Sequence, residues 1–146
     1  MKELKVYTDG ACRGNPGPGG WAGIILHDTH QEKVQGFEKN TTNNRMELSA
    51  VIYTLKKIDK NTPIMLHTDS QYVMKGMMEW VKNWEKRGWR TSNNKPVKNM
   101  DLWKVLVEVC SCRQITWKWV KGHSGDQFNE LADSLANQAL DQNVGA

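Results

Sequence analysis

Long apolar runs are missing from this sequence of 146 residues. No window approaches the run of about 20 apolar residues that a membrane helix requires, so we expect no membrane span. The first residues, Met1 to Val6, also lack the apolar stretch of a secretory signal. We therefore expect a cytoplasmic protein.

Cysteine is scarce, with three residues, an odd number that cannot pair completely. Cys110 and Cys112 lie two positions apart, but no second pair is present to complete a zinc site. These absences argue against a disulfide-stapled secreted domain and predict reduced thiols. The chain is long enough to bury a core without disulfides. No stretch resembles a linker, and we expect one domain spanning residues 1–146.

The net charge of +4 is modest, but its distribution along the chain is uneven. Residues 71–99 contain seven basic residues against Glu79 and Glu85, so this segment carries +5 and the rest of the chain −1. The same segment holds three of the seven tryptophans: Trp80, Trp84 and Trp89. Basic residues interleaved with flat aromatic side chains are typical of a nucleic-acid-binding surface. The alternative is a solvated helix face whose tryptophans point into the core.

Hydrophobic periodicity predicts three strands first, at residues 4–9, 21–27 and 33–38, which suggests an antiparallel meander. The glycine- and proline-rich segment Gly14–Gly20 predicts an obligatory turn between the first two. Residues 43–58 then change to the period of an amphipathic helix, with candidate N-caps at 41–44.

The second half of the chain alternates between helix and strand patterns. It predicts a buried strand at 63–67, helices at 71–82 and 100–110, a strand at 115–119, and a last helix from Phe128 to Ala139. The order βββαβααβα predicts an α/β protein with one mixed sheet and helices packed on it.

Three acidic residues lie where a predicted strand ends or a helix begins: Asp9, Glu47 and Asp69. Ligands bind at strand ends in α/β sheets, so Asp9 and Asp69 could meet on adjacent strands. Clustered carboxylates require a cation, and oxygen ligands favour Mg²⁺ or Mn²⁺ over zinc. Two such ions about 3.5–4 Å apart catalyse in-line displacement at phosphorus.

Position alone leaves a second interpretation of these acids open. Asp9 and Asp69 could be turn residues, and Glu47 an acid favoured by the helix dipole. Asp133 lies on the last helix, off its apolar face, and could be a solvated side chain.

Four local strings decide between these interpretations, because together they closely resemble bacterial ribonuclease H of type 1. The strings are Thr8–Cys12 with Gly14–Gly17, Thr42–Glu47, Thr68–Tyr72, and Val120–His123 with Leu131–Asp133. The resemblance runs in order from about Leu4 to Ala139 and includes that family's basic protrusion at about residues 80–99. It implies the ribonuclease H-like fold, with three antiparallel strands followed by two parallel ones in a five-stranded sheet flanked by helices.

The resemblance also implies a monomeric endonuclease that hydrolyses the RNA strand of RNA–DNA hybrids and leaves 5′-phosphate and 3′-hydroxyl ends. Asp9, Glu47, Asp69 and Asp133 match the family's metal-binding acids, which hold two Mg²⁺ ions, with Mn²⁺ as a substitute. By this resemblance Asp9 would bridge both ions. Asp133 would complete the ion that activates water, and Glu47 and Asp69 would hold the ion facing the leaving 3′ oxygen.

His123 matches the family's mobile catalytic histidine, and its glycine and serine neighbours suit a switching role. The alternative is an ordinary surface histidine. For the substrate, the resemblance assigns RNA 2′-hydroxyl contacts to Asn15, Asn43, Gln71 and the backbone near Cys12. It places Asn43 also against the DNA strand, with Asn44 beside it, and Thr42 at a DNA phosphate. The DNA backbone would lie on the protrusion, against Trp80, Trp84, Lys86, Arg87, Trp89 and Lys98.

The sequence departs from the family pattern at two places. Glu85 stands where relatives often carry a base, which predicts a weaker grip by the protrusion. Asp126-Gln127-Phe128 replaces the usual His-Pro-Glu after the histidine loop, which leaves that loop's motion open. Glu130 keeps the family's acid near Asp133, either to tune the metal site or as a plain surface residue.

Two rival functions remain for comparison. A related nuclease acting on DNA alone would lack the amides and the tryptophan-rich protrusion. A hybrid-binding module without activity would lack an acid. This sequence contains the amides, the tryptophan-rich protrusion and all four acids.

Overall fold

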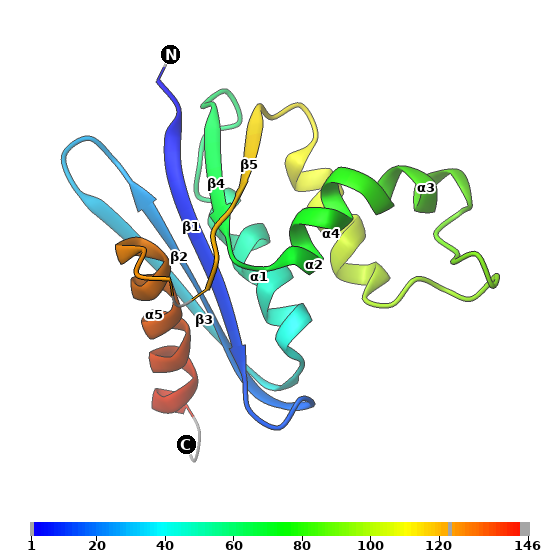
Figure 1. The fold of residues 1–146 in the computed structure, drawn as a ribbon, viewed down its shortest axis with the longest axis horizontal. Helices are drawn as coiled ribbons and strands as arrows, with labels where there is room; N and C mark the ends of the chain where they lie inside the picture. The colour runs from blue at the N-terminus through cyan, green and yellow to red at the C-terminus, as the bar shows by residue number, and fades with distance from the viewer. Residues whose placement is uncertain (1, 123, 144–146) are drawn as a thin grey trace.

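The computed structural model describes residues 2–122 and 124–143. Five strands form one sheet in the order β3-β2-β1-β4-β5 (Figure 1). Their bounds are β1 Leu4–Cys12, β2 Gly17–Leu26, β3 Gln31–Thr41, β4 Ile64–Thr68 and β5 Ile115–Trp119. The first three strands pair antiparallel, whereas β1 with β4 and β4 with β5 pair parallel. The mixed sheet expected from the sequence is confirmed.

The helices cover both faces of this sheet. They are α1 Asn43–Leu55, α2 Gln71–Lys75, a π-helical turn η1 Gly76–Trp80, α3 Val81–Lys86, α4 Met100–Cys110 and α5 Gln127–Asn143. Successive strand residues point to opposite faces of a sheet. Val6 of β1 accordingly packs in one cluster with residues of α1 and α4, and Tyr7 packs in another with α5. No helix among the described residues is both long and apolar enough to cross a bilayer.

The main core lies on the α1 side of the sheet. It includes Val6, Leu48, Leu66, Trp103 and Leu106, all of them buried without residual exposure. Thr42 caps α1, since its side chain accepts a hydrogen bond from the Arg45 amide. The N-cap expected between residues 41 and 44 is therefore confirmed.

The predicted turn over Gly14–Gly20 is wrong in its second half, because β2 already begins at Gly17. Gly20 pairs with Ala11 of β1 and Phe37 of β3. A Cβ atom there would lie 2.3 Å from the carbonyl oxygen of Ala136 on α5. This glycine therefore allows a helix to lie directly on the sheet, a tertiary requirement that local turn chemistry does not reveal.

The helix predicted at 71–82 is interrupted at η1 and then continues to Lys86. The indole ring of Trp103 lies so close to Gly76 that the helix has no room for a side chain there. The wide π-helical turn coincides with this contact, as is common where a helix adapts to a packing partner. Figure 1 shows α3 and the loop after it extending away from the sheet, with Arg90 and Pro96 bridged across that loop.

Candidate active site

Asp9, Glu47 and Asp69 converge at one edge of the central strands. One carboxylate oxygen from each lies within 4.8 Å of those of the other two. The parallel register of β1 and β4 explains why Asp9 and Asp69 meet. The last pair in this register is Thr8 with Thr68, and the residue after each threonine is the aspartate. The predicted meeting of Asp9 and Asp69 is confirmed. Asp9 does not end its strand, however, since β1 continues to Cys12 along β2.

Glu47 reaches this cluster because α1 lies directly against β1 at Gly10. A Cβ atom on Gly10 would lie 2.6 Å from the backbone nitrogen of Glu47. The Gly10 amide also donates a 2.9 Å hydrogen bond to Asp9 Oδ1. A glycine next to the aspartate therefore serves both acids, since it admits the helix and orients the carboxylate.

Burial makes this cluster electrostatically costly without a cation. Asp9 is 3% exposed and Glu47 is 5% exposed. Burial, followed by the charge of Asp69 and contact with Asp133, raises the pKa of Asp9 to about 9, against the opposing hydrogen bond from Gly10. Burial and the charges of Asp9 and Asp69 likewise raise the pKa of Glu47 well above its usual range. Buried carboxylates of like charge shift in this direction because their ionised forms lose solvation and repel one another.

The donor set fits a hard divalent cation. Glu47 Oε1 is buried and has no hydrogen-bond partner among the described residues. All three candidate ligands are carboxylates, which suit Mg²⁺ or Mn²⁺ and not the softer metals. A buried carboxylate oxygen that has no hydrogen-bond partner and belongs to a cluster of acids can serve as a metal ligand. The residues present are therefore compatible with divalent metal binding.

Asp133 lies on α5, on the other face of the sheet, outside the group of three carboxylates. Its carboxyl contributes to raising the pKa of Asp9. The Asn137 amide holds Asp133 from one turn later, donating to its carbonyl oxygen at 2.9 Å and to Oδ1 at 3.4 Å. Glu130, nearer the start of α5, is exposed. His123 lies outside the described residues.

The residues expected to read the RNA strand fall into two places. Asn15 Oδ1 accepts a 2.9 Å hydrogen bond from the backbone N–H of Asn43. This bond joins the turn between β1 and β2 to the start of α1. A cavity of about 370 Å³ opens beside them and is lined by Asn15, Pro16, Thr42, Asn43, Asn44, Lys98 and Asn99. Lys98 thus lies with the amides, although the sequence analysis grouped it with the tryptophans.

Gln71 does not line that cavity and instead lines another one, of about 550 Å³. Trp119 lines the same cavity, and its indole nitrogen donates to the Asp69 carbonyl oxygen at 3.3 Å. Cys12 Sγ is hydrogen-bonded to the carbonyl oxygens of Gly17 and Thr41 at 3.6 and 3.4 Å. These thiol contacts tie β1 to β2 and β3.

The basic protrusion, defined here as residues 80–99, is built on an aromatic ladder. Ring centroids are 5.8 Å apart for Trp80 and Trp84 and 6.1 Å apart for Trp84 and Trp89. Trp84 and Trp89 are partly buried against the main core, so the packing interpretation of these tryptophans holds in part. Lys86 and Arg87 are exposed at the end of α3. A cavity of about 460 Å³ lies between Trp80, Trp84, Arg87 and Arg90.

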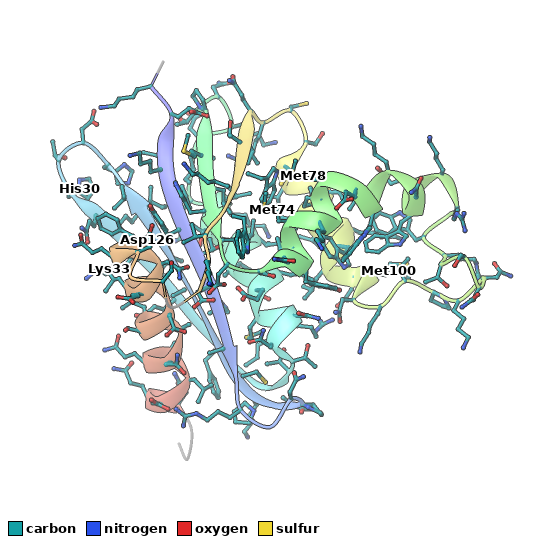
Figure 2. All side chains as sticks on the ribbon, viewed as in Figure 1. His30, Lys33, Met74, Met78, Met100 and Asp126 are labelled. Carbon is teal, nitrogen blue, oxygen red and sulfur yellow. The ribbon has the colours of Figure 1, made fainter. Side chains whose placement is uncertain are left out.

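The departure at Asp126–Phe128 has a structural role. Asp126 Oδ1 accepts hydrogen bonds from the amides of Phe128 and Asn129 at 3.1 and 3.0 Å, and so caps α5. The Phe128 ring lies 5.5 Å from the ring of Tyr7 on β1. Asp126, labelled in Figure 2, lies just before the start of α5. Asp126 thus caps the helix, and Phe128 packs it against the sheet.

Sequence analysis gave no site role to three residues at these sites: Arg90, Asn99 and Trp119. Arg90 and Asn99 lie within the protrusion at about residues 80–99, so the sequence did offer a signal for both. Trp119 was predicted only as a strand residue, because its contact with Asp69 joins residues distant in sequence.

An oxygen-rich acidic cluster on a sheet of this topology defines a metal-dependent nuclease-type site, and comparisons with known proteins agree. The family model described as RNase H matches residues 1–141. The ribonuclease H of Wolbachia sp. subsp. Drosophila simulans is 57% identical over 139 residues, which cover 95% of this chain and 96% of that one. The chain therefore belongs to the ribonuclease H family.

Solved structures share the fold. LC9-RNase H1, described as a type 1 RNase H with the type 2 active-site motif, matches with a TM-score of 0.85 and 31% identity over 97% of this chain and 74% of that one. LC11-RNase H1, solved in complex with an RNA/DNA hybrid, matches with a TM-score of 0.74 at 21% identity, covering 98% of this chain and 100% of that one. The second likeness concerns the fold alone.

Proposed function

We propose that this protein is an endonuclease that hydrolyses the RNA strand of RNA–DNA hybrids with the help of bound divalent cations. The observation that carries the proposal is the buried cluster of Asp9, Glu47 and Asp69, with ligand atoms within 4.8 Å of one another in a ribonuclease H chain. We further propose Mg²⁺ as the ion, with Mn²⁺ as the alternative, and a monomer in the cytoplasm as the working form.

The four acids have distinct tasks in this proposal. Asp9, Glu47, Asp69 and Asp133 would hold two cations, which would supply positive charge to the reacting phosphate and lower the pKa of bound water. Asp9 is central, because the carboxyls of Asp69 and Asp133 raise its pKa and its own charge raises the pKa of Glu47. The rigid elements that carry these side chains keep the carboxylates in place before substrate binds, which reduces the reorganisation needed for reaction. His123 assists proton movement or product release.

Strand discrimination depends on neutral side chains in this proposal. Asn15, Asn43 and Gln71 offer amide donors and acceptors beside the acids, and a 2′-hydroxyl can exchange hydrogen bonds with such groups. The Cys12 backbone, Thr42 and Asn44 complete this surface. The DNA strand lies against the protrusion, where cationic and aromatic side chains hold a backbone without reading its sugar. These are Trp80, Trp84, Lys86, Arg87, Trp89 and Lys98.

The test is cleavage of three matched duplexes, RNA–DNA, RNA–RNA and DNA–DNA, with and without Mg²⁺. We expect Mg²⁺-dependent cutting of the RNA strand in the hybrid and little or none of the other two. Asp69→Asn removes one ligand charge while preserving shape, so turnover should be lost and hybrid binding retained. Equal cleavage of all three duplexes, or near-normal turnover by Asp69→Asn, contradicts the proposal.

A second experiment separates ribose recognition from general binding. Asn15→Ala and Gln71→Ala should reduce hybrid cleavage and leave weak binding of DNA duplexes nearly unchanged. Both side chains are exposed in the free protein, and each would lose a hydrogen bond that the bound hybrid buries, at a cost of about 1–3 kcal/mol. If both duplexes lose affinity equally, these amides support the fold or the shared backbone and do not recognise the ribose.

A further inference from the structure

The junction between α2 and α4 is organised around one hydroxyl group. The Tyr72 oxygen accepts a 3.1 Å hydrogen bond from Asn99 Nδ2 and a 2.9 Å hydrogen bond from Trp103 Nε1. Trp103 has no exposed surface, so its indole N–H has no access to water. Met74 of α2 and Met100 of α4, labelled in Figure 2, mark the two sides of this junction. A single oxygen therefore satisfies two donors from the start of α4.

The other end of the Asn99 side chain extends the junction to α1. Asn99 Oδ1 accepts from Arg45 Nη1 at 3.3 Å. Arg45 is in turn held by a bidentate pair with Asp101, at 3.0 and 2.8 Å. Asn99 has a φ of 61°, a left-handed conformation that asparagine adopts more readily than most residues. The asparagine amide thus connects the start of α1 to Tyr72, with the strong Arg45–Asp101 pair beside it.

Each residue of this junction adjoins a surface assigned to substrate. Arg45 follows Asn43 and Asn44 on α1, and Tyr72 follows Gln71 on α2. The Tyr72 ring also packs against the foot of the protrusion, with its centroid 5.9 Å from that of Trp80 and 5.2 Å from that of Trp103. Trp103 continues to Trp84 at 5.3 Å. The amide-lined surface and the aromatic ladder therefore meet at Tyr72.

We propose that Tyr72 is a positioning residue that sets the spacing between the amides that contact the RNA strand and the protrusion that contacts the DNA strand. The inference rests on the proposed function, since it presupposes a duplex bound across both surfaces. A duplex engages both at once only when their spacing matches the separation of its strands, and pre-organised spacing avoids an ordering cost on binding. A single strand that contacts only one surface gains nothing from the spacing. Tyr72 touches no substrate in this arrangement and acts through Asn99 and Trp103.

The experiment compares Tyr72→Phe with the matched variant Tyr53→Phe. Tyr72→Phe removes only the hydroxyl and keeps the ring contacts with Trp80 and Trp103. Tyr53 is 45% exposed and stacks on Trp21, on the far part of α1, so its hydroxyl serves as the control. Steady-state kinetics on a short hybrid give KM and kcat, and fluorescence anisotropy gives the affinity for single-stranded DNA of the same length.

We expect Tyr72→Phe to raise KM for the hybrid by about 2- to 10-fold, the range that corresponds to one hydrogen bond. The kcat and the affinity for single-stranded DNA should stay within about 2-fold of wild type, as for Tyr53→Phe throughout. Asn99→Ala should reproduce the rise in KM, and the double variant should add little, because both changes break one network. Trp103→Phe, which removes the other donor to the Tyr72 hydroxyl at a residue outside the amide-lined cavity, is the second variant if Tyr72→Phe folds poorly.

Two results overturn the positioning role. One is an unchanged KM for the hybrid in folded Tyr72→Phe and Asn99→Ala. The other is a parallel loss of hybrid and single-strand affinity, which marks a general structural effect. Failure of the proposed function is distinguishable, because wild-type protein would then cleave no hybrid at all.

Discussion

Asp9→Asn tests whether the buried acids destabilise the metal-free fold. In an unfolded chain the Asp9 carboxyl ionises at its ordinary pKa of 3.8, whereas burial and the neighbouring acids raise its pKa to about 9 in the folded protein. The folded state therefore binds this proton more tightly than the unfolded state does. Linkage then requires that stability be full below pH 3.8 and decline as the pH rises toward 9. Asparagine carries no charge, so the variant should lack the part of this decline that Asp9 causes.

The size of the effect follows from the same two values. One pKa unit corresponds to 1.36 kcal/mol, so holding Asp9 protonated at pH 7 costs about 4 kcal/mol at most. The gain in the free energy of unfolding of the variant is smaller than this cost, because Glu47 and Asp69 also repel one another and remain in the variant. We expect metal-free Asp9→Asn to be more stable than wild type by about 2–4 kcal/mol at pH 7, or roughly 5–15 °C in Tm.

The assay is urea unfolding followed by circular dichroism, in EDTA, at several pH values between 4 and 9. Asp28→Asn is the matched control, because the Asp28 side chain is 89% exposed, and we expect a change within about 0.5 kcal/mol. Mg²⁺ should stabilise wild type more than the variant, since a ligand that binds only the folded state adds stability. A wild-type stability that is flat across this pH range, or an Asp9→Asn protein less stable than wild type at pH 8, refutes the reasoning.

Three further predictions concern the protrusion, the histidine and the fold. Neutralising Lys86, Arg87 and Lys98 should weaken hybrid binding, with little change in turnover at saturating substrate. The slope of log affinity against log salt concentration should fall by about one unit per lost phosphate contact. An unchanged slope in a salt titration contradicts this docking role. His123→Ala should lower turnover by about 10²–10⁴-fold with metal dependence retained, and a pH–rate profile identical to wild type would assign the histidine to the surface. Arg113 donates to the carbonyl oxygens of Val109 at 2.8 Å and of Leu55 and Ile58 at 3.0 Å. Arg113→Ala should therefore destabilise the protein by about 1.5–3 kcal/mol in urea unfolding, with hybrid cleavage by the folded variant serving as the check that the loss is confined to stability.

Local patterns were sufficient for most of the secondary structure. The alternation around Val6 and Tyr7 predicts a strand, and the spacing of Leu48, Val51 and Leu55 predicts a helix that the structure has at Asn43–Leu55. These patterns are reliable because burial on one face imposes a fixed period on each element. The second half of the turn predicted over Gly14–Gly20 was wrong for the opposite reason. Gly20 is required by Ala136, a residue more than a hundred positions away.

The acids of the site also divide into those that the strand pattern places and those that only helix packing places. Asp9 and Asp69 were predicted to meet because parallel strands bring equivalent ends together, and their register confirms it. Glu47 was grouped with them because it lies where a helix begins, and the recognised strings add Asp133, but no periodicity places either beside Asp9. Close packing of α1 on Gly10 positions Glu47, and α5 brings Asp133 from the opposite face.

By itself, the sequence determined the family, the order of strands and helices, and the types of residue that perform the chemistry. These follow from local periodicity and from short strings whose side chains are adjacent in the chain. Only the tertiary structure decided that Lys98 lies with the amides, that Asp126 and Phe128 fasten α5, and that Tyr72 joins Asn99 to Trp103. Hydrogen bonds and packing contacts of this kind join residues far apart in sequence. Their geometry exists only once the sheet has brought the helices together.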